Sequence, residues 1–354
     1  MDQSCPTDQP RGAHLVGSVP LGSAEEVFRT ASAKLGAHLR RIPDGETGDR
    51  SQWVGWQGFA FKRLPQFELV KPSPGQYPPT PRFRPRAGAD LTGAGFGNLG
   101  YADEALRSFE VFRALRDQGV IRPGVRFQVS IPTPLAPVVM FVVDGAQAQV
   151  EPLYEAQMLD ELRRILEGIP HDLLAMQWDV CIEMWLWERW LAAPFEDVEG
   201  EVLARLARLG AAVPDGVELG FHLCYGDYQH EHFKQPADAG ILVEMAGGIL
   251  AGVERPVQWL HLPVPIDRSD DGYFRPMERL TGLDRTELYL GLVHFRDGVG
   301  GTGARVRTAL DHVRAFGVAA ECGLGRRPAD RGGAPATLGP LLETHAASSH
   351  PVFD

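Results

Sequence analysis

Residues 220–227 read GFHLCYGD, an apolar run that carries two metal-ligand side chains near its end. His222 and Cys224 are two residues apart, so in a strand their side chains point to the same face and can reach one ion. Imidazole nitrogen and thiolate sulfur are the ligands of a borderline-soft ion such as zinc. Such a pair can also be a core histidine beside a small buried hydrophobe, so the rest of the chain has to decide between the two interpretations.

Seven further apolar runs alternate with amphipathic helical stretches. This alternation predicts an α/β fold with a parallel sheet, and eight strands are the number in a (β/α)8, or TIM, barrel. The expected strands are His14–Val19, Leu39–Pro43, Val125–Ile131, Leu173–Val180, Val217–Tyr225, Val257–Val264, Glu287–Phe295 and Val318–Leu324. We predict one barrel domain over residues 1–354, with a long loop or lid insertion at 64–95 after the second strand and a tail over 326–354.

Composition narrows the class of function. The formal net charge of -11 disfavours a nucleic-acid or anionic-membrane partner, because phosphate binding needs concentrated Lys and Arg. No apolar run approaches the roughly 18 residues of a membrane-spanning helix, and the first residues lack a signal-peptide pattern. The four cysteines are too few and too scattered for a disulfide framework. We expect a reduced, cytoplasmic protein that acts on a small molecule.

Polar side chains occur at the ends of nearly all the predicted strands. They are Ser18, Asp44, Glu46, Asp179, His222, Cys224, His261, His294 and Cys322. In a TIM barrel the active site lies at the carboxyl ends of the strands, whereas chance would scatter such residues over both ends. Asp179 interrupts an apolar strand, and a buried carboxylate requires partners. The pattern therefore predicts one active site at the carboxyl-terminal mouth of the barrel.

Several of these residues lie in motifs that resemble those of the cobalamin-independent methionine synthase family. That family belongs to the superfamily that also holds uroporphyrinogen decarboxylase and zinc-dependent coenzyme M alkyltransferases. GFHLCYGD and ECGLGRR resemble its HxC and CGLxxR zinc motifs. HLVGSVP resembles its IGSFP motif, DGETGDR resembles its GExxR motif, and QWDV occupies the position of its IDEP strand end. The resemblance covers essentially the whole chain, as a single catalytic barrel.

The resemblance implies that His222, Cys224 and Cys322 hold a zinc ion. The family supplies its fourth ligand, a glutamate, from the strand that corresponds to VQWLHLPV, and this stretch contains no acid. His261 stands where the acid would be. Either its imidazole replaces the carboxylate as a ligand, or the fourth position belongs to water or substrate.

The resemblance also implies that Ser18, Glu46 and Asp179 face a thiol substrate, with the acids holding an α-amino group. Carboxylate partners suit an ammonium group in a low-dielectric site. Asp44, beside Glu46, is a further candidate for substrate binding. The alternative for Asp44 and Glu46 is a solvated turn, because Asp-Gly is a turn signal.

The expected activity is a zinc-dependent transfer of a methyl or alkyl group to a small thiol. A metal cation stabilises thiolate over thiol, and the bound sulfur remains nucleophilic. His294 is the candidate closest to the family's acid-base histidine and could protonate the departing group, while Asp297 could bind a charged substrate tail. The alkyl donor stays open between a methylated folate, a methyl corrinoid and another activated alkyl compound.

Three other functions are compatible with these residues. A related zinc barrel could make or break C–S bonds by addition or elimination, for example with an epoxide or an unusual sulfur metabolite. A metal-free barrel similar to a decarboxylase would clamp substrate carboxylates with arginines such as Arg41, Arg50 and Arg296. A non-catalytic protein would retain a structural zinc in a closed shell of four protein ligands.

Overall fold

The computed structural model describes residues 9–70, 80–226, 232, 234–326 and 335–353. Its main sheet contains β1 (Ala13–His14), β2 (Arg41–Pro43), β5 (Arg126–Pro132), β6 (Leu174–Val180), β7 (Glu218–Leu223), β8 (Trp259–Pro263), β9 (Glu287–Val293) and β10 (Gly317–Ala320). All neighbours in the order β1-β10-β9-β8-β7-β6-β5-β2 are parallel. Backbone bridges from Ala13 to Leu39 and from Ser18 to Gly45 connect the two edges, so the sheet nearly closes. The predicted TIM barrel is confirmed.

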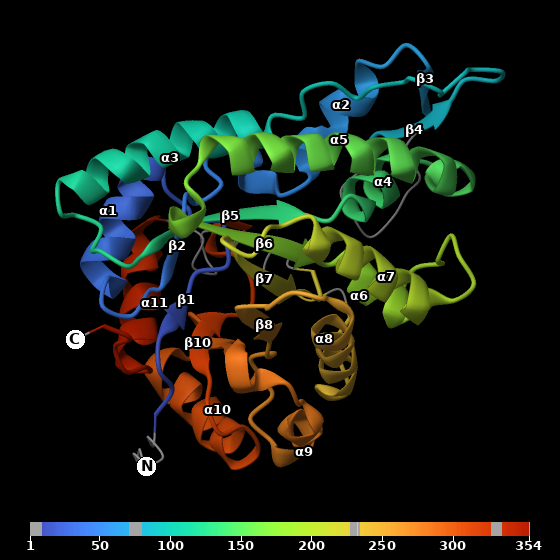
Figure 1. Cartoon of the computed structure of the whole chain (residues 1–354). Coiled ribbons are helices and arrows are strands. Elements are labelled where there is room, and N and C mark those ends of the chain that lie inside the picture. Colours follow the sequence, from blue (N-terminus) through green and yellow to red (C-terminus); the bar gives the residue numbers. More distant parts are fainter. Residues whose placement is uncertain (1–8, 71–79, 227–231, 233, 327–334, 354) are drawn as a thin grey trace.

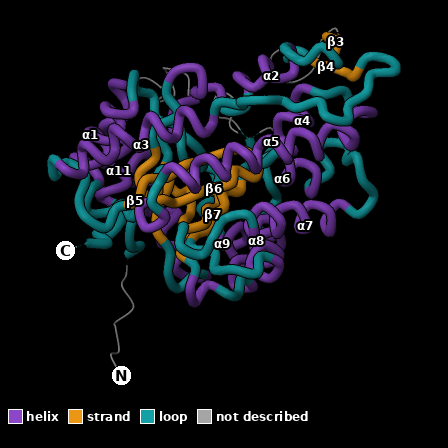
Figure 2. Tube along the Cα trace, turned by 45° about the horizontal axis from the view of Figure 1, so that its top comes forward, coloured by secondary structure: helices purple, strands orange, loops and turns teal. Residues whose placement is uncertain are grey.

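Helices surround the strands, which Figure 2 shows as the central group of the molecule. They are α1 (Ala24–Leu35), α2 (Gly58–Lys62), α3 (Tyr101–Asp117), α4 (Leu135–Phe141), α5 (Gln147–Gly168), α6 (Ile182–Trp187), α7 (Val198–Ala211), α8 (Gly240–Gly252), α9 (Asp271–Phe274), α10 (Gly298–His312) and α11 (Pro335–Ala347). Helix α1 begins after Ser23, whose hydroxyl accepts a hydrogen bond from the backbone N–H of Glu26. Its apolar face, with Val27 and Phe28, is buried in the core between helices and strands.

Each expected strand corresponds to one strand of the barrel, although several, the first above all, are shorter than predicted. The expected strand His14–Val19 pairs regularly only over Ala13–His14. Beyond it the backbone is irregular, and the N–H of Val19 donates to the carbonyl of Gly45 at 2.9 Å. The chain after β1 therefore lies beside the chain after β2, where two of the predicted site motifs meet.

The insertion after β2 contains a small antiparallel hairpin of β3 (Phe67–Val70) and β4 (Arg82–Pro85), which lies outside the barrel at the upper right of Figure 1. Aromatic packing attaches the preceding helix α2 to the barrel. The ring of Phe61 stacks on that of Tyr154 in α5, with centroids 5.5 Å apart and planes 3° from parallel. The predicted insertion at 64–95 is thus confirmed as a hairpin with packed neighbours; its residues 71–79 lie outside the described part.

The expected tail, 326–354, carries α11, which packs beside α1 and α10. Lys34 of α1 forms an ion pair with Glu343 of α11 at 2.7 Å. Residues 327–334 lie outside the described residues. The end of the chain therefore adds a helix that lies against α1, α10 and β9 in the outer layer of the barrel.

Large side chains fill the inside of the barrel at the amino-terminal ends of the strands. The ring of Trp259 occupies the space beside Gly220, where a Cβ atom would lie 1.9 Å from the ring. The guanidinium of Arg41 stacks on Trp259 at 4.2 Å and forms ion pairs with Glu218 at 2.5 Å and Glu287 at 2.7 Å. Because the barrel interior is filled at this end and its charges are paired, the interior space that is left for a ligand lies at the carboxyl-terminal end.

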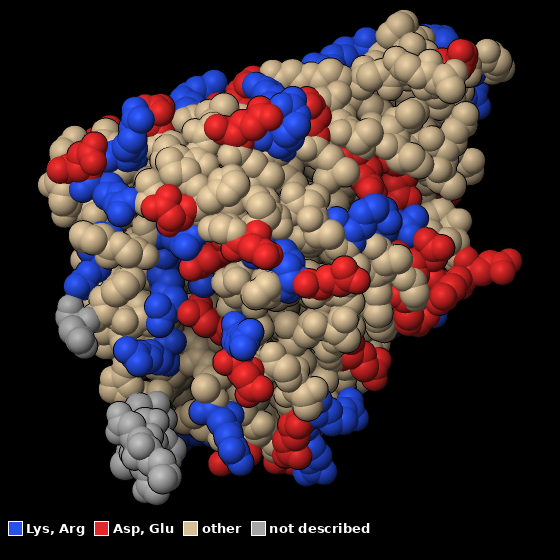
Figure 3. Space-filling model, viewed as in Figure 1, with Lys and Arg blue, Asp and Glu red and all other residues tan. Residues whose placement is uncertain are grey.

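Acidic and basic side chains are interspersed over the molecular face shown in Figure 3. No helix in the described part of the chain combines the length and the hydrophobicity needed to cross a bilayer.

Candidate active site

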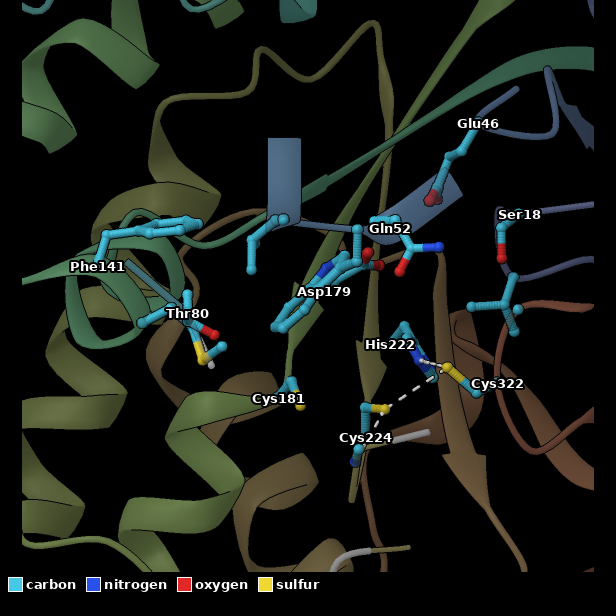
Figure 4. Close-up of a pocket in the computed structure, with 17 residues that line it drawn as sticks. Ser18, Glu46, Gln52, Thr80, Phe141, Asp179, Cys181, His222, Cys224 and Cys322 are labelled. Carbon is cyan, nitrogen blue, oxygen red and sulfur yellow. Dashed lines mark hydrogen bonds between the residues drawn. The ribbon is translucent and has the colours of Figure 1, made fainter. Parts of the chain in front are cut away.

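A cavity of about 130 Å³ lies at the carboxyl ends of the barrel strands (Figure 4). Six residues that the sequence singled out line it: Ser18, Glu46, Asp179, His222, Cys224 and Cys322. They come from β6 and β7 and from the segments that follow β1, β2 and β10. The fold therefore brings together residues that are up to 304 positions apart, between Ser18 and Cys322, at the end of the barrel where an active site was expected.

Three of these residues form a buried group whose ligand atoms all lie within 4.8 Å of one another: His222, Cys224 and Cys322. His222 belongs to β7, and Cys224 follows that strand on the same face. The Sγ atoms of Cys224 and Cys322 are 3.7 Å apart, and Sγ of Cys322 lies 3.6 Å from Nε2 of His222. The backbone N–H of Gly226 donates to Sγ of Cys224 at 3.3 Å, a contact that favours the thiolate. This group could hold a metal ion.

The spacing of the three ligand atoms fits a tetrahedral ion. With zinc–sulfur bonds of about 2.3 Å and a zinc–nitrogen bond of about 2.05 Å, tetrahedral angles place two sulfurs about 3.8 Å apart and a sulfur and a nitrogen about 3.6 Å apart. The separations of 3.7 and 3.6 Å in this group agree with both values. Cys322 is therefore placed at tetrahedral spacing from both of the other ligand atoms, and all three atoms lie within 4.8 Å of one another.

His261 lies behind this group, next to His222 on the neighbouring strand. Its Nδ1 is 2.7 Å from Nδ1 of His222, and its Nε2 is 2.9 Å from the carbonyl oxygen of Ala320. A carbonyl only accepts, so Nε2 of His261 carries the proton. Burial lowers the pKa of His261 to about 4, so the ring is neutral and its Nδ1 accepts. His222 then donates from Nδ1, which leaves the lone pair of its Nε2 directed at the cysteines.

Three motifs of the sequence contact one another around Ser18 and Glu46. A Cβ atom on Gly17 would lie 2.2 Å from the carboxylate of Glu46, and one on Gly323 would lie 2.2 Å from the hydroxyl of Ser18. The N–H of Leu324 donates to the carbonyl of Ser18 at 2.7 Å. The glycines before Ser18 and after Cys322 therefore leave the room that these two side chains occupy.

Glu46 sits in a turn that other side chains hold in place. Its φ angle is +48°, a conformation that is strained for a residue with a side chain. Asp44 accepts from Arg50 at 3.2 and 2.8 Å, from the hydroxyl of Ser108 at 2.7 Å and from the N–H of Glu46 at 3.0 Å. Burial alone would raise the pKa of Asp44, but Arg50 outweighs it and lowers the pKa. Asp44 is buried rather than part of a solvated turn.

A smaller chamber of about 20 Å³ adjoins the main cavity. Glu46, Trp53 and Asp179 line both spaces. Its other walls include Asp44, Tyr101 and Arg50, whose charge is paired with that of Asp44. A space of this size accommodates one water molecule or one ammonium group. Acidic side chains around such a space favour a small cation over an anion.

His294, the candidate acid-base residue, and Asp297, the candidate for binding a substrate tail, lie outside the lining of this cavity. Nε2 of His294 is 2.9 Å from the carbonyl oxygen of Val264, and its Nδ1 is 3.7 Å from the carboxylate of Glu321. Asp297 forms a two-pronged ion pair with Arg305 at 2.7 and 2.9 Å where α10 begins. The structure thus groups these residues with the β8 and β9 ends rather than with the His222 group.

Other lining residues had not been predicted from the sequence. They are Gln52, Trp53, Thr80, Met140, Phe141 and Cys181 among others. In Figure 4 Phe141 and Thr80 lie on the opposite side of the cavity from Ser18. They come from α4 and from the insertion, and no motif marks them. Cys181 did carry a signal, since it follows Asp179 by two positions and points to the same cavity.

The fold and the site together define an α/β barrel with a buried group of metal-ligand side chains at its carboxyl-terminal mouth. No protein-family model matches the chain. No curated protein matches it either.

Solved structures do resemble it over nearly their full length. A B12-independent methionine synthase from Shewanella sp. W3-18-1, in complex with selenomethionine, superposes with a TM-score of 0.60 at 12% identity, with 96% of each chain covered. A Listeria monocytogenes protein assigned as a vitamin-B12-independent methionine synthase gives 0.55 at 12% identity, again with 96% of each chain covered. A methyltransferase from Methanosarcina mazei gives 0.55 at 13% identity, over 98% of this chain and 94% of that one. The chain therefore has the barrel fold of these proteins.

Proposed function

We propose that this protein is a zinc-dependent enzyme that transfers a methyl or alkyl group to the sulfur of a small thiol. In this reaction a carbon–sulfur bond forms, and the donor leaves with the electron pair of the bond that breaks. The observation that carries the proposal is the buried group of His222, Cys224 and Cys322, in which the separations of Cys322 from the other two ligand atoms match the edges of a tetrahedral zinc site. A site with three protein ligands keeps its fourth position for a substrate.

The donor set favours zinc among the common ions. Two thiolates and one imidazole suit a borderline-soft ion, whereas magnesium and calcium prefer oxygen ligands. Zinc held by these residues would lower the pKa of an entering thiol, so that the sulfur reacts as a thiolate. Burial of all three side chains, at 2 to 6% exposure, keeps water away from the sulfur.

His261 supports this site as the partner of a ligand rather than as the fourth ligand. Its two nitrogens are engaged by His222 and by the carbonyl of Ala320. A metal-binding histidine usually donates its other N–H to a neighbouring acceptor, which fixes the ring and its tautomer. Here that acceptor is another imidazole. The fourth position then stays open for the thiol.

Glu46 and Asp179 are proposed to bind a substrate ammonium group, and Ser18 to bound the same end of the cavity. Both acids face the small chamber, whose volume of about 20 Å³ suits one ammonium group. The apolar wall with Met140 and Phe141 lies in the same cavity and suits an uncharged part of the thiol or of the donor. Together they favour a small aminothiol as acceptor.

Two of the alternative functions lack support in the cavity. A decarboxylase needs cationic side chains to clamp carboxylates; none of the described residues that line the main cavity is Lys or Arg, and Arg50, which lines the small chamber, is paired with Asp44. Arg41 is held by Glu218 at the other end of the barrel, and Arg50 is held by Asp44. A purely structural zinc would need four protein ligands, whereas the described ligand group has three.

Metal content tests the proposal first. The purified protein is expected to hold about one zinc per chain, and Cys224→Ala and Cys322→Ala are each expected to lose it. Cys181→Ala is the matched control, because Cys181 is also buried and lines the same cavity but stands outside the ligand group. Zinc that stays bound in Cys322→Ala at wild-type stoichiometry would contradict the site.

Thiol binding and methyl transfer to the thiol test the second part of the proposal. Replacing zinc by cobalt gives a visible spectrum in which an entering thiolate adds a sulfur-to-metal band. A series of small aminothiols is expected to produce this band, and mass spectrometry of the thiol after addition of an activated methyl donor is expected to show the S-methyl product. If no thiol changes the cobalt spectrum, thiol activation is wrong.

A further inference from the structure

A buried glutamine connects the proposed substrate acid to the interior of the barrel. Gln177 and Asp179 are two residues apart on β6, so both side chains point into the barrel. Gln177 is completely buried, and its Nε2 donates to Oδ1 of Asp179 at 2.9 Å. The same nitrogen donates to the carbonyl oxygen of Val16 at 2.7 Å. Val16 precedes Ser18 by two residues and lines the cavity.

The orientation of this amide follows from its neighbours. The carbonyl of Val16 can only accept, so it needs the NH₂ end of Gln177. At the other end, Oε1 of Gln177 lies 3.4 Å from Nε1 of Trp259, which can only donate, and 2.9 Å from Nε2 of His14. If the amide were flipped, its oxygen would face the carbonyl of Val16 and the carboxylate of Asp179, and its NH₂ group would face the N–H of Trp259. The donor therefore faces Asp179.

We propose that Gln177 is a positioning residue that acts through Asp179, holding its carboxylate at the cavity wall for the ammonium group of an aminothiol. The inference rests on the proposed function and adds a residue to it. Because one NH₂ group contacts both Asp179 and the carbonyl of Val16, Gln177 also sets the distance between the acid and the chain that leads to Ser18. Loss of the hydrogen bond that holds the ammonium-binding carboxylate is expected to weaken binding of the ammonium group about tenfold.

The chain offers a matched control in Gln128 of the neighbouring strand β5. Gln128 is 1% exposed, and its Nε2 donates to the carbonyls of Leu15 at 3.0 Å and Val16 at 2.9 Å. It therefore supports the same segment after β1 as Gln177 does. Gln177 makes the hydrogen bond to Asp179 that the comparison tests, and Gln128 reaches Oε1 of Gln177 at 3.5 Å. Methionine has nearly the length of glutamine and no donor, so Gln177→Met and Gln128→Met remove comparable groups.

The experiment compares two thiols of similar size on cobalt-substituted protein. Cysteamine carries an ammonium group and 2-mercaptoethanol does not, and the thiolate band reports the dissociation constant of each. Gln177→Met is expected to weaken cysteamine binding about tenfold and 2-mercaptoethanol binding less than about twofold. Gln128→Met is expected to change both by less than about twofold. If Gln177→Met does not fold, Gln177→Asn replaces it, since the shorter amide keeps a polar interior but does not reach Asp179.

Each possible result of this thiol-binding experiment tests a different claim. Equal weakening of both thiols in Gln177→Met, or an identical loss in Gln128→Met, would leave Gln177 a structural residue and overturn the inference. Equal binding of the two thiols to the wild type would overturn the ammonium role of Asp179, and the inference with it. A wild-type cobalt protein that shows no thiolate band with either thiol would overturn the proposed function itself. Thermal unfolding of the metal-free variants supplies a readout that does not depend on the ion.

Discussion

The two sides of the cavity are built in different ways. The metal group, His222, Cys224 and Cys322, stands on β7 and directly after β10, with the regular strand β8 behind it. The β2 turn, residues 44–53, faces it and has almost no regular hydrogen bonding beyond a short 3-10 helix. Glu46 and Trp53 in this turn have φ angles of +48° and +54°. Both line the cavity, so the strained residues of the turn are those that face a ligand.

This difference in construction reflects two requirements of a binding site: fixed distances between metal ligands, and an acid that is aimed into the cavity. Metal ligands need fixed distances, which the strands of one sheet supply because their registry is set by backbone hydrogen bonds. A turn can adopt the unusual backbone that aims a particular acid into the cavity, at a cost of about 1–3 kcal/mol for each strained residue. Such strain persists only when other contacts hold it. In the β2 turn these contacts are the bonds from Arg50 and Ser108 to Asp44.

The largest expected effect comes from removing Arg50. Arg50→Met leaves the carboxylate of Asp44, which is 5% exposed, without its cationic partner, and breaking a buried ion pair in this way costs about 3–5 kcal/mol. Urea denaturation measures the loss. Arg107→Met is the control, because Arg107 pairs with Glu104 at the exposed surface and should cost less than about 1 kcal/mol. Metal binding by Arg50→Met should persist, which would show that the turn and the metal group are independent.

The same pair predicts a dependence on pH. The folded protein holds the pKa of Asp44 below its ordinary value of 3.8. The unfolded chain therefore takes up the proton first as the pH falls, so this stabilisation is complete above about pH 4 and declines as the pH falls through the folded pKa. The wild-type and Arg50→Met stabilities should converge in that acidic range. Curves that stay parallel down to pH 2 would mean that Asp44 is not the group involved.

A change behind the metal group should have an intermediate effect. His261→Ala removes the acceptor for Nδ1–H of His222, and loss of such a supporting partner lowers metal affinity about 10- to 100-fold. The cobalt protein should keep the absorption of a two-thiolate, one-imidazole site. His14→Ala is the control, because His14 is buried in the same interior with its ring centroid 5.9 Å from that of His261. A changed coordination spectrum in His261→Ala would instead make His261 a ligand.

Which site residues could be predicted from the sequence depends on what a short sequence pattern can encode. His222 and Cys224 could be placed together because alternation along a strand is a local rule, and Cys322 could be added because parallel strands end at one mouth. The same rule placed His294 near the mouth, but it could not tell that Nε2 would be engaged by the carbonyl of Val264. Which way a side chain turns at a strand end depends on neighbours that are distant in sequence.

Trp53 and Phe141 illustrate a second limit of prediction from the sequence. Neither belongs to a strand, and both line the cavity only because the β2 turn and α4 fold over the mouth of the barrel. The position of Phe141 depends on the aromatic packing around Phe61, whose ring lies 5.5 Å from that of Phe141. Packing of this kind is set by the whole core, so a reading of single motifs finds the metal side of the site more completely than the turn side.

Adding one methyl group at Gly17 or at Gly323 should have a smaller effect than the changes above. Gly17→Ala would put a Cβ atom 2.2 Å from the carboxylate of Glu46, and Gly323→Ala would put one 2.2 Å from the hydroxyl of Ser18. Each is expected to displace that side chain at a cost of about 1–3 kcal/mol and to weaken aminothiol binding, with zinc retained. Dissociation constants on the cobalt protein measure the effect. Gly145→Ala, where a Cβ atom meets open space, is the control.

The smallest effect is expected for a residue that lies outside both the metal group and the β2 turn. Ser23 caps α1, and Ser23→Ala removes the hydrogen bond from the N–H of Glu26, at a cost of about 1 kcal/mol. Urea denaturation should show this loss, while zinc content and thiol binding stay at wild-type levels. The variant matters because Gly17→Ala is expected to cost a similar amount. If Ser23→Ala weakened thiol binding as much as Gly17→Ala does, general destabilisation would explain both, and the β2 turn would have no special role in binding.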